Sequence, residues 1–368
     1  MRLSRLTQSI GLFLSLVLIP IRVSAQTFFD VADHFKHEEA IESLASLGII
    51  NGYPDGSFQP EKSISRAEAA KILIGTVKPP TTIEETQNDL YSYNFLSLFS
   101  DVGNEEWFAP YVMLAYQNGI IQGYSDGSFR PANIINMAEG LKMILESYGM
   151  DATRARYVEH PLLLIGPDDW FTHYFEYSYN RNLISREKFY HPAQGMTRGE
   201  FAEILFRLKT IRDSGEESYT ETKNLTSDEY TITIPRLNII SLDVSFADPF
   251  DPQGSLGVLN SGLGHYLSPP GSGHKMVLFG HSSGYSWDKS PYKTILTKID
   301  QLQQGDIIYL NYQEKGYIYQ INQREIRPAT DMASVMKDYG YEEMALYTCW
   351  PPNSISKRYV VYASPISN

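Results

Sequence analysis

Residues 49–60 read IINGYPDGSFQP, and residues 120–131 read IIQGYSDGSFRP, 71 positions further along the chain. An amphipathic segment precedes each copy and ends in a glycine, Gly48 or Gly119, which suits a helix C-cap. The Asp-Gly pair inside each copy marks a tight turn. This internal repeat therefore predicts helix–turn–helix units in the first half of the chain.

A helix-start pattern follows each copy. Residues 65–68 (SRAE) and 136–139 (NMAE) place a capping side chain three positions before a glutamate, which is the spacing of a capping box. Residues 197–200 (TRGE) repeat the pattern in a third, weaker copy, whose turn is two residues shorter and lacks Asp-Gly. A single unit cannot bury its apolar face, so we expect three units to pack together over residues 27–208, at about 27–77, 96–150 and 165–208.

These repeats resemble the S-layer homology family in their Asp-Val start (residues 30–31 and 101–102), their GYxDGSFxP turn and their helix start. The resemblance implies an all-α pseudo-threefold bundle that binds anionic cell-wall polysaccharide, often one with a pyruvyl ketal. It also implies that Arg66 and Arg198 reach this ligand, since an arginine at a helix N-terminus suits an anion. The alternative is that they only solvate helix ends. The second copy has Met137 at this position, so one groove is expected to lack the anion contact.

The first 25 residues have the features of a secretion signal. A start with two arginines precedes an apolar stretch at residues 10–21, and residues 23–25 (VSA) offer small side chains for cleavage. Twelve apolar residues are too few to span a bilayer comfortably. We therefore expect a signal peptide cleaved after Ala25 and a secreted protein of the cell surface or cell wall. An uncleaved membrane anchor is the alternative.

Charge and cysteine content narrow the function. The formal net charge is −12, which gives no support for nucleic acid as a partner. The single cysteine, Cys349, cannot form an intrachain disulfide. It is therefore an inert buried thiol, an intermolecular link or a reactive group.

The second half of the chain has a different pattern. A polar run at residues 209–229 predicts an interdomain linker. After it, apolar residues alternate at Tyr230, Ile232 and Ile234, which is the period of a half-buried strand. Several short strands with polar turns follow, so residues 230–368 are expected to form an all-β closed barrel or sandwich. The fold class is thus multidomain, with the all-α bundle first and the β domain second.

Three reactive side chains lie at predicted strand ends in this second half. Cys349 closes the apolar strand at residues 345–349, and Arg358 opens the next strand. If these strands form a hairpin, the two residues face each other across its mouth. His281 similarly follows a strand and enters a loop of Ser, Gly and Tyr. Such a cluster is typical of a site built on a rigid scaffold.

Residues 230–368 resemble the sortase family. The matching segments are a glycine and histidine at the end of a strand, a variant of the TLxTC motif with Ala345 in place of its first Thr, and an RxVV strand: residues 279–281 (FGH), 345–349 (ALYTC) and 358–361 (RYVV). The resemblance implies a closed β-barrel and a cysteine transpeptidase. Such an enzyme cleaves an LPxTG-like sorting signal on a protein, forms a thioacyl-enzyme, and passes the acyl group to an amine, either a wall peptide or a pilin lysine.

The resemblance also assigns roles to residues. Cys349 is the nucleophile, Arg358 stabilises the oxyanion, and His281 acts as general acid and base, which suits the chemistry of these groups. His265 and Thr348 are weaker candidates for substrate binding. No cofactor or metal is expected.

Two other functions are compatible with parts of this pattern. An L,D-transpeptidase also uses Cys, His and Arg on a β scaffold, but its motif places His and Gly directly before the cysteine, where this chain has Tyr347 and Thr348. The sequence therefore disfavours it. A non-catalytic structural or adhesive wall protein with an inactive barrel remains open.

Overall fold

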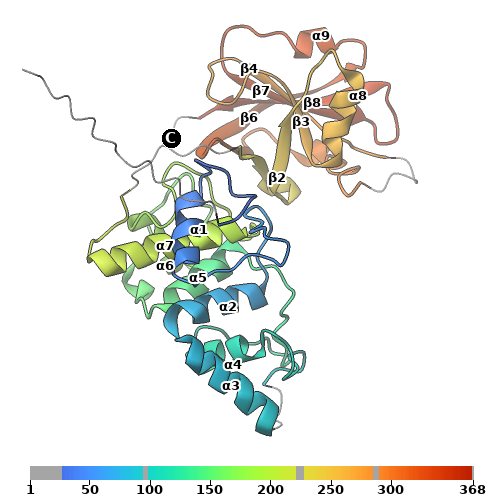
Figure 1. The fold of residues 1–368 in the computed structure, drawn as a ribbon. Helices are drawn as coiled ribbons and strands as arrows, with labels where there is room; N and C mark the ends of the chain where they lie inside the picture. Colours follow the sequence, from blue (N-terminus) through green and yellow to red (C-terminus); the bar gives the residue numbers. More distant parts are fainter. Residues whose placement is uncertain (1–26, 94–97, 221–227, 285–289, 367–368) are drawn as a thin grey trace, which may run out of the picture.

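The computed structural model describes residues 27–93, 98–220, 228–284 and 290–366 (Figure 1). A helical bundle precedes a β-barrel, which lies against one end of the bundle. The expected signal peptide and its cleavage position fall outside the described residues. Among the residues that are described, none of the helices has both the length and the apolar character needed to cross a membrane.

The bundle is built from three consecutive helix pairs. The first helices of the pairs are α1 (Glu38–Ser46), α4 (Ala109–Gln117) and α6 (Thr172–Asn180), and the second helices are α2 (Arg66–Val77), α5 (Met137–Ser147) and α7 (Arg198–Ser214). Each second helix begins at a complete capping box, with Ser65, Asn136 or Thr197 as the N-cap residue. The helix starts predicted from the sequence are therefore confirmed.

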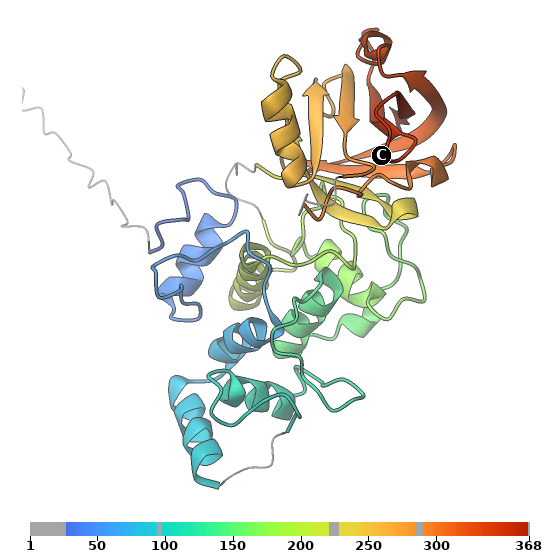
Figure 2. The ribbon, with the colours of Figure 1, turned by 90° about the vertical axis from the view of Figure 1, so that its right-hand side faces the viewer.

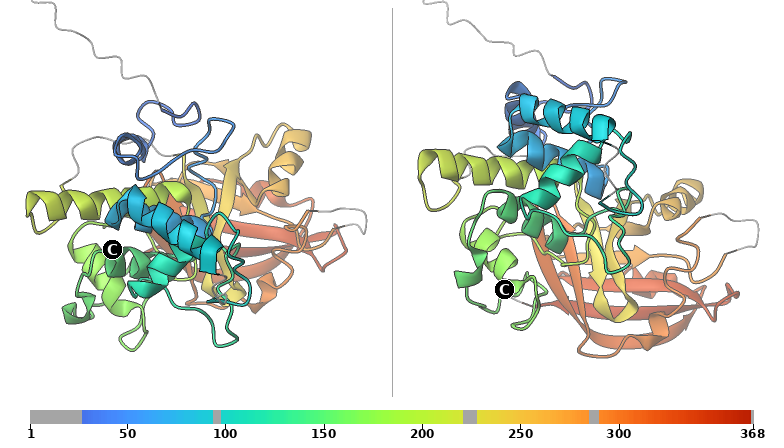
Figure 3. Two further views of the ribbon diagram at one scale, coloured as in Figure 1. Left: turned by 60° about the horizontal axis from the view of Figure 1, so that its bottom comes forward. Right: turned by 90° about the horizontal axis from the view of Figure 1, so that it is seen from below.

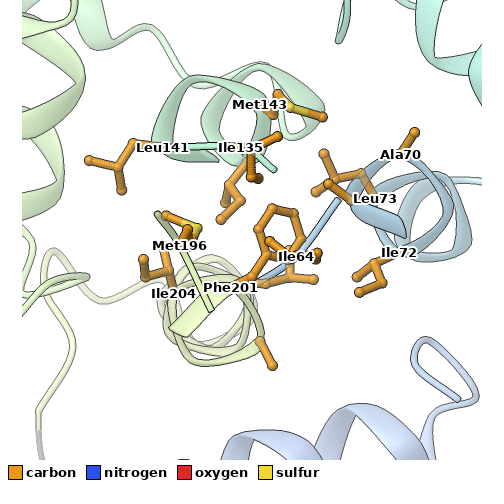
Figure 4. Packing of buried hydrophobic residues seen from close by; sticks show 14 of the residues in the cluster. Ile64, Ala70, Ile72, Leu73, Ile135, Leu141, Met143, Met196, Phe201 and Ile204 are labelled. Carbon is orange, nitrogen blue, oxygen red and sulfur yellow. The ribbon is translucent and has the colours of Figure 1, made fainter. Parts of the chain in front are cut away.

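A ring of backbone hydrogen bonds joins the three units. The amide of Ile64 donates to the carbonyl of Met196 (2.9 Å), Met196 donates to Ile135 (3.0 Å), and Ile135 donates back to Ile64 (3.1 Å). Their side chains meet in the middle of the bundle with Phe201 and Leu73 (Figure 4). Each unit thus contacts both of the others, which is the pseudo-threefold arrangement that the resemblance to the S-layer homology family implied.

The Asp-Val start has a structural cause. The carboxylate of Asp30 accepts the amides of Phe58 and Gln59, both at 2.7 Å, and so holds the turn of its own unit. Asp101 does the same in the second unit, with two hydrogen bonds of 2.7 Å to its DGSF turn. The conserved spacing within the repeat therefore fixes the turn against the first helix.

A further helix and a longer α7 complete the helical half. Between the first two units, the polar segment after α2 forms α3 (Pro80–Tyr93). The expected linker at 209–229 begins as helix, because α7 continues to Ser214 and ends at Gly215 in the left-handed conformation. The reason is continued burial, since Ile211 still packs into the bundle core. Residues 221–227 of the expected linker lie outside the described residues.

In the described part of the second half, eight strands close into a barrel with the order β1-β2-β3-β4-β7-β8-β6-β5. The strands are β1 (Tyr230–Ile234), β2 (Ile239–Phe246), β3 (Leu263–Leu267), β4 (Lys275–Phe279), β5 (Ile307–Tyr312), β6 (Lys315–Pro328), β7 (Glu343–Trp350) and β8 (Lys357–Pro365), with short helices α8 (Pro252–Gly257) and α9 (Met332–Val335). The pairing of β1 with β5 completes the closure. The structure therefore decides for a closed barrel over a sandwich.

Side chains of each strand alternate between two faces. Leu278 of β4 and Leu346 of β7 fill the barrel interior. Val277 and Ala345, one position earlier, point outward and pack under α9. This alternation decides which residues share the face that carries the reactive side chains.

The barrel contacts the third helix pair of the bundle. Figures 1 and 2 show α3 and α4 at the far end of the bundle from the barrel, and in Figure 3, where the bottom faces the viewer, these helices lie in front of the barrel. The contact is made by the β5–β6 hairpin, where the amide of Gly316 donates to the carbonyl of Glu187 (2.5 Å).

Candidate active site

Strands β7 and β8 form an antiparallel pair in which Cys349 is directly opposite Arg358. The sequence expectation that these two residues face each other across the hairpin is confirmed. Because side chains alternate along a strand, Cys349 shares the outward face with Tyr347 and Ala345, and Arg358 shares it with Val360.

Strand β4 brings His281 to the same place. It runs parallel to β7, with Phe279 paired to Tyr347, and the amide of Gly280 donates to the Tyr347 carbonyl (3.3 Å). If this parallel register is continued by two residues along both segments, His281 comes level with Cys349. We call His281, Cys349 and Arg358 the reactive row. It crosses three neighbouring segments of the chain on one face of the barrel.

Hydrogen bonds fix the segment that carries His281. The hydroxyl of Thr348 donates to the carbonyl of Gly280 (2.6 Å), and the hydroxyl of Ser282 donates to the carbonyl of Cys349 (2.7 Å). The amide of Leu296 donates to the His281 carbonyl (2.9 Å). Both residues that flank His281 are therefore tied to the cysteine strand. Ser282 was not identified from the sequence, where its only signal is that it follows His281.

The reactive row is accessible, whereas its supports are buried. His281, Cys349 and Arg358 are each partly exposed. Ser282 and Thr348 are 2% and 1% exposed. This combination, a buried frame under an open row, suits groups that must meet a substrate in a fixed geometry.

The loop between β7 and β8 holds Arg358 at the mouth of the hairpin. One guanidinium nitrogen, Nη1, donates to the carbonyls of Ile355 and Lys357, both at 2.9 Å. The loop itself is fixed, since the amide of Asn353 donates to the hydroxyl of Ser283 (2.9 Å). The positive charge is therefore fixed at the mouth of the hairpin that carries Cys349.

Aromatic rings form the surface next to the row. Tyr266 of β3 stacks on Phe279, with ring centroids 4.3 Å apart, and Phe279 lies parallel to Tyr347 at 5.9 Å. Burial, more than any neighbouring charge, raises the pKa of Tyr347 well above its usual range. Its hydroxyl therefore stays neutral and does not compete with Cys349 as a nucleophile.

The proposed substrate contacts of His265 and Thr348 are not supported by the structure. His265 pairs with Leu278 and is 0% exposed, on the opposite face of the sheet from the reactive row. Its Nδ1 lies 2.9 Å from the Tyr230 hydroxyl, and burial lowers its pKa to about 4. Thr348 points inward and positions Gly280, as described above. Both side chains are structural because the two-residue period of a strand turns them away from the open face.

Arg198 crosses from the third unit into the turn of the first. Its Nε donates to the carbonyl of Phe58 (2.9 Å), and its guanidinium lies over the ring of Tyr53 at 4.7 Å. It lines a groove of about 440 Å³ together with Lys71 and Trp107, whose side chains form a cation–π contact of 5.5 Å. We call this groove the Arg198 site. The guanidinium is built into a groove between units rather than solvating a helix end.

Arg66 has the same surroundings one unit further along. Its Nε donates to the carbonyl of Phe129 (2.9 Å), and its guanidinium lies over Tyr124 at 5.1 Å. Lys142 and Trp170 form a cation–π contact of 5.8 Å, matching the Lys and Trp of the Arg198 site. We call this the Arg66 site. Both arginines are largely buried, and beside each lie a tyrosine ring and the capping-box glutamate of the neighbouring unit, with Glu68 at 3.4 Å from Arg198 and Glu139 at 3.9 Å from Arg66.

A closed eight-strand barrel with a cysteine, a histidine and an arginine in one row agrees with the fold and residues that the sortase resemblance implied. The family model described as "Sortase domain" matches residues 232–366, and the model described as "S-layer homology domain" matches residues 27–70 and 98–139. The chain therefore carries a sortase domain behind S-layer homology repeats. Residues 165–208, the third unit of the bundle, lie outside these two repeat matches.

Relatives of the repeats are cell-surface proteins. The chain is 30% identical over 114 residues to the "Surface layer protein" of Brevibacillus choshinensis, a match that covers 31% of this chain and 10% of the relative. It is 30% identical over 130 residues to the "Cellulosome-anchoring protein" of Acetivibrio thermocellus, covering 34% and 26%. The chain thus spans only a small part of these relatives. The repeats and these relatives support association with the cell surface and wall.

Solved structures similar to the chain are sortases. Sortase C-1 from Actinomyces oris is 25% identical, with a TM-score of 0.32, over 38% of this chain and 74% of that one. Sortase C from Clostridium perfringens SM101 is 24% identical, with a TM-score of 0.30, over 38% and 69%.

Proposed function

We propose that this protein is a cell-surface cysteine transpeptidase of the sortase type, attached to wall polymer by its repeats. The observation that carries the proposal is the strand register, which aligns Cys349 with Arg358 on one side and His281 on the other. A thiol, an imidazole and a guanidinium in one row are the groups that nucleophilic attack on an acyl carbon requires.

The first half of the reaction breaks an amide bond. The sulfur of Cys349 attacks the carbonyl carbon after Thr of an LPxTG-like sorting signal on a protein substrate. Arg358 donates hydrogen bonds to the oxygen as it becomes negative. His281 gives a proton to the departing amine, and the acyl group remains on the sulfur as a thioester.

The second half makes a new amide bond. An amine acceptor, a wall peptide or a pilin lysine, attacks the thioester carbon. His281 removes the proton of the incoming amine, and Cys349 leaves as the thiolate. Water in place of the amine would give hydrolysis. No step requires a cofactor.

The repeats supply the attachment. The Arg198 and Arg66 sites each combine a guanidinium, a lysine and aromatic rings, which suits an anionic cell-wall polysaccharide such as one with a pyruvyl ketal. After cleavage of the signal peptide following Ala25, attachment would be through the wall polymer rather than through the membrane.

Mass spectrometry of the purified protein with an LPxTG-type peptide library tests the enzymatic half. We expect a thioacyl adduct on Cys349 that an added amine discharges, and none on Cys349→Ala. As a control for folding, a small alkylating reagent should label the wild-type thiol. Labelling without any peptide adduct would favour the alternative, a structural or adhesive wall protein with an inactive barrel.

A further inference from the structure

Pseudo-threefold symmetry predicts a third site equivalent to the Arg198 and Arg66 sites. Each of those two combines an arginine at the first position of a second helix with a tryptophan directly before the N-cap of a first helix. Each also has a lysine three positions after the capping-box glutamate. In the third site, these three positions are Met137, Lys36 and Glu203. We call it the Met137 site.

The three substitutions remove the guanidinium, the aromatic ring and the ammonium group that the other two sites present. Met137 has no donor and is 0% exposed. Lys36 replaces the aromatic ring, and the carboxylate of Glu203 replaces an ammonium group. Arg207 and His37 already contact that carboxylate, at 2.6 Å and 3.4 Å. An incoming anion would meet a negative charge where the other sites present a positive one.

The Met137 site is also nearly full. The open space at the Arg198 site is about 440 Å³, whereas at the Met137 site it is about 50 Å³. Lys188 and Arg207 of the third unit line the remaining space. Glu314, at the turn between β5 and β6, reaches it from the barrel. The barrel therefore closes the groove that the third unit would otherwise leave open.

The contact between barrel and bundle is specific. The side-chain amide of Asn311 accepts a hydrogen bond from the Phe189 amide (2.8 Å) and donates one to the Phe189 carbonyl (2.9 Å). The ring of Tyr309 stacks on that of Phe189 with centroids 3.9 Å apart. At Gly316, a β-carbon would lie 2.8 Å from the Phe189 nitrogen, so the approach of the two backbones requires glycine. Asn311 and Phe189 are 3% and 2% exposed.

Buried ion pairs join the two parts. Lys188 lies 2.7 Å from Glu229, which directly precedes β1, and Lys36 lies 3.6 Å from Glu314. Both lysine side chains are at most 7% exposed, so their charges would be costly without these carboxylates. The two lysines of the Met137 site therefore form ion pairs with glutamates that lie next to the ends of barrel strands.

We propose that the Met137 site is the socket that holds the sortase barrel, and that polymer binding is left to the Arg66 and Arg198 sites. In the strand order, the docked β5 and its neighbour β1 lie opposite the pair β4 and β7. The reactive row is therefore on the side of the barrel away from the wall-binding repeats. The part of this proposal that concerns polymer binding rests on the proposed function, whereas the part that concerns docking of the barrel does not.

Binding stoichiometry tests the polymer part. We would titrate the full chain with a short saccharide that carries one pyruvyl ketal and follow the heat released. We expect two sites in the wild type and one in Arg66→Met or Arg198→Met. Met137→Arg should still bind two, because Glu203 and the barrel occupy the groove. Three sites in the wild type, or a third in Met137→Arg, would overturn the proposal. Absence of all binding would count against wall attachment itself.

Hydrogen exchange tests the socket independently of any ligand. In the full chain carrying Tyr309→Ala and Asn311→Ala, we expect the amides of Phe189 and Gly316 to exchange roughly tenfold faster. Amides of the inner ring, such as that of Ile64, should keep their protection. Asn322→Ala is the matched control, because this side chain bonds to Ser364 within the barrel. Unchanged protection at Phe189 and Gly316 in the double variant would show that the barrel is not held there.

Discussion

Cys349 lies level with His281 on one side and Arg358 on the other. The reason is that β4 and β7 end, and β8 begins, at the same edge of the barrel. Hydrogen bonds from Thr348 and Ser282 lock that alignment from beneath. A change at any of these positions therefore acts on the geometry of the row as well as on its chemistry.

Arg358 should be sensitive to conservative replacement. Arg358→Lys keeps the charge but loses the planar pair of donors, so we expect thioacyl formation to slow by about 10²–10³-fold. Alkylation of Cys349 by a small reagent should be nearly unchanged. Arg236→Lys, at an exposed ion pair with Asp306, is the control. Equal rates in wild type and Arg358→Lys would exclude the oxyanion role.

His265 should make the barrel sensitive to acid. Burial lowers its pKa to about 4 in the folded state, whereas the unfolded chain has an ordinary histidine near 6.5. As pH falls below about 6.5 the unfolded state takes up the proton first, so stability present at neutral pH is lost towards pH 4. At about pH 5 the loss from this group is about 2 kcal/mol.

Urea unfolding near pH 7.5 and pH 5, followed by exchange of barrel amides, measures this loss. His265→Gln retains a polar side chain but does not titrate, so its stability should change less between the two pH values than that of the wild type. The same pH dependence in both proteins would mean that His265 is not the responsible group.

At the scale of elements, the bundle depends on its helix starts. The capping boxes lie next to the inner ring of hydrogen bonds, so each one both ends a turn and begins a helix that contributes to the core. Local and tertiary preferences coincide at these positions, which favours a single arrangement of the three units.

Loss of one cap should be measurable. Asn136→Ala leaves the amide of Glu139 without its side-chain acceptor, so we expect the free energy of unfolding of the bundle to fall by about 1 kcal/mol. Ser147→Ala, at the other end of α5, removes a hydroxyl bonded to Ile144 and serves as the control. Urea midpoints measure both, and equal midpoints would contradict a stabilising cap.

At the scale of the whole molecule, the proposed roles fall on different parts of the chain. The two sites proposed to bind an anion lie in the repeats, and the barrel docks on the third unit with the reactive row on the far side of the barrel. Attachment and catalysis should therefore be separable by mutation.

Wall binding should depend on both arginines. Cell walls that contain their polymer should sediment the wild-type protein, and the combined Arg66→Met and Arg198→Met variant should remain in the supernatant. The variant should still acylate Cys349 in solution. Arg186→Met, at an exposed arginine of the third unit, is the control. Full sedimentation of the double variant would place the attachment elsewhere.

The sequence by itself determined the features that depend on local patterns. The repeats, the capping boxes and the position of Cys349 opposite Arg358 follow from spacing along the chain, because turns and strand ends are set by nearby residues. The period of two also predicted the strands of the barrel.

Tertiary structure decided what depends on contacts between distant residues. The sequence could not show that His265 faces inward, because an alternating strand has two faces and only the closed barrel distinguishes them. Met137 indicated an altered groove. The proposed role of this groove as a socket, however, depends on Glu314 and Asn311, which lie more than a hundred positions from Met137 in the sequence. Burial of such polar groups is favourable only once both halves of the molecule are in place, because each alone would leave charges and hydrogen bonds unpaired.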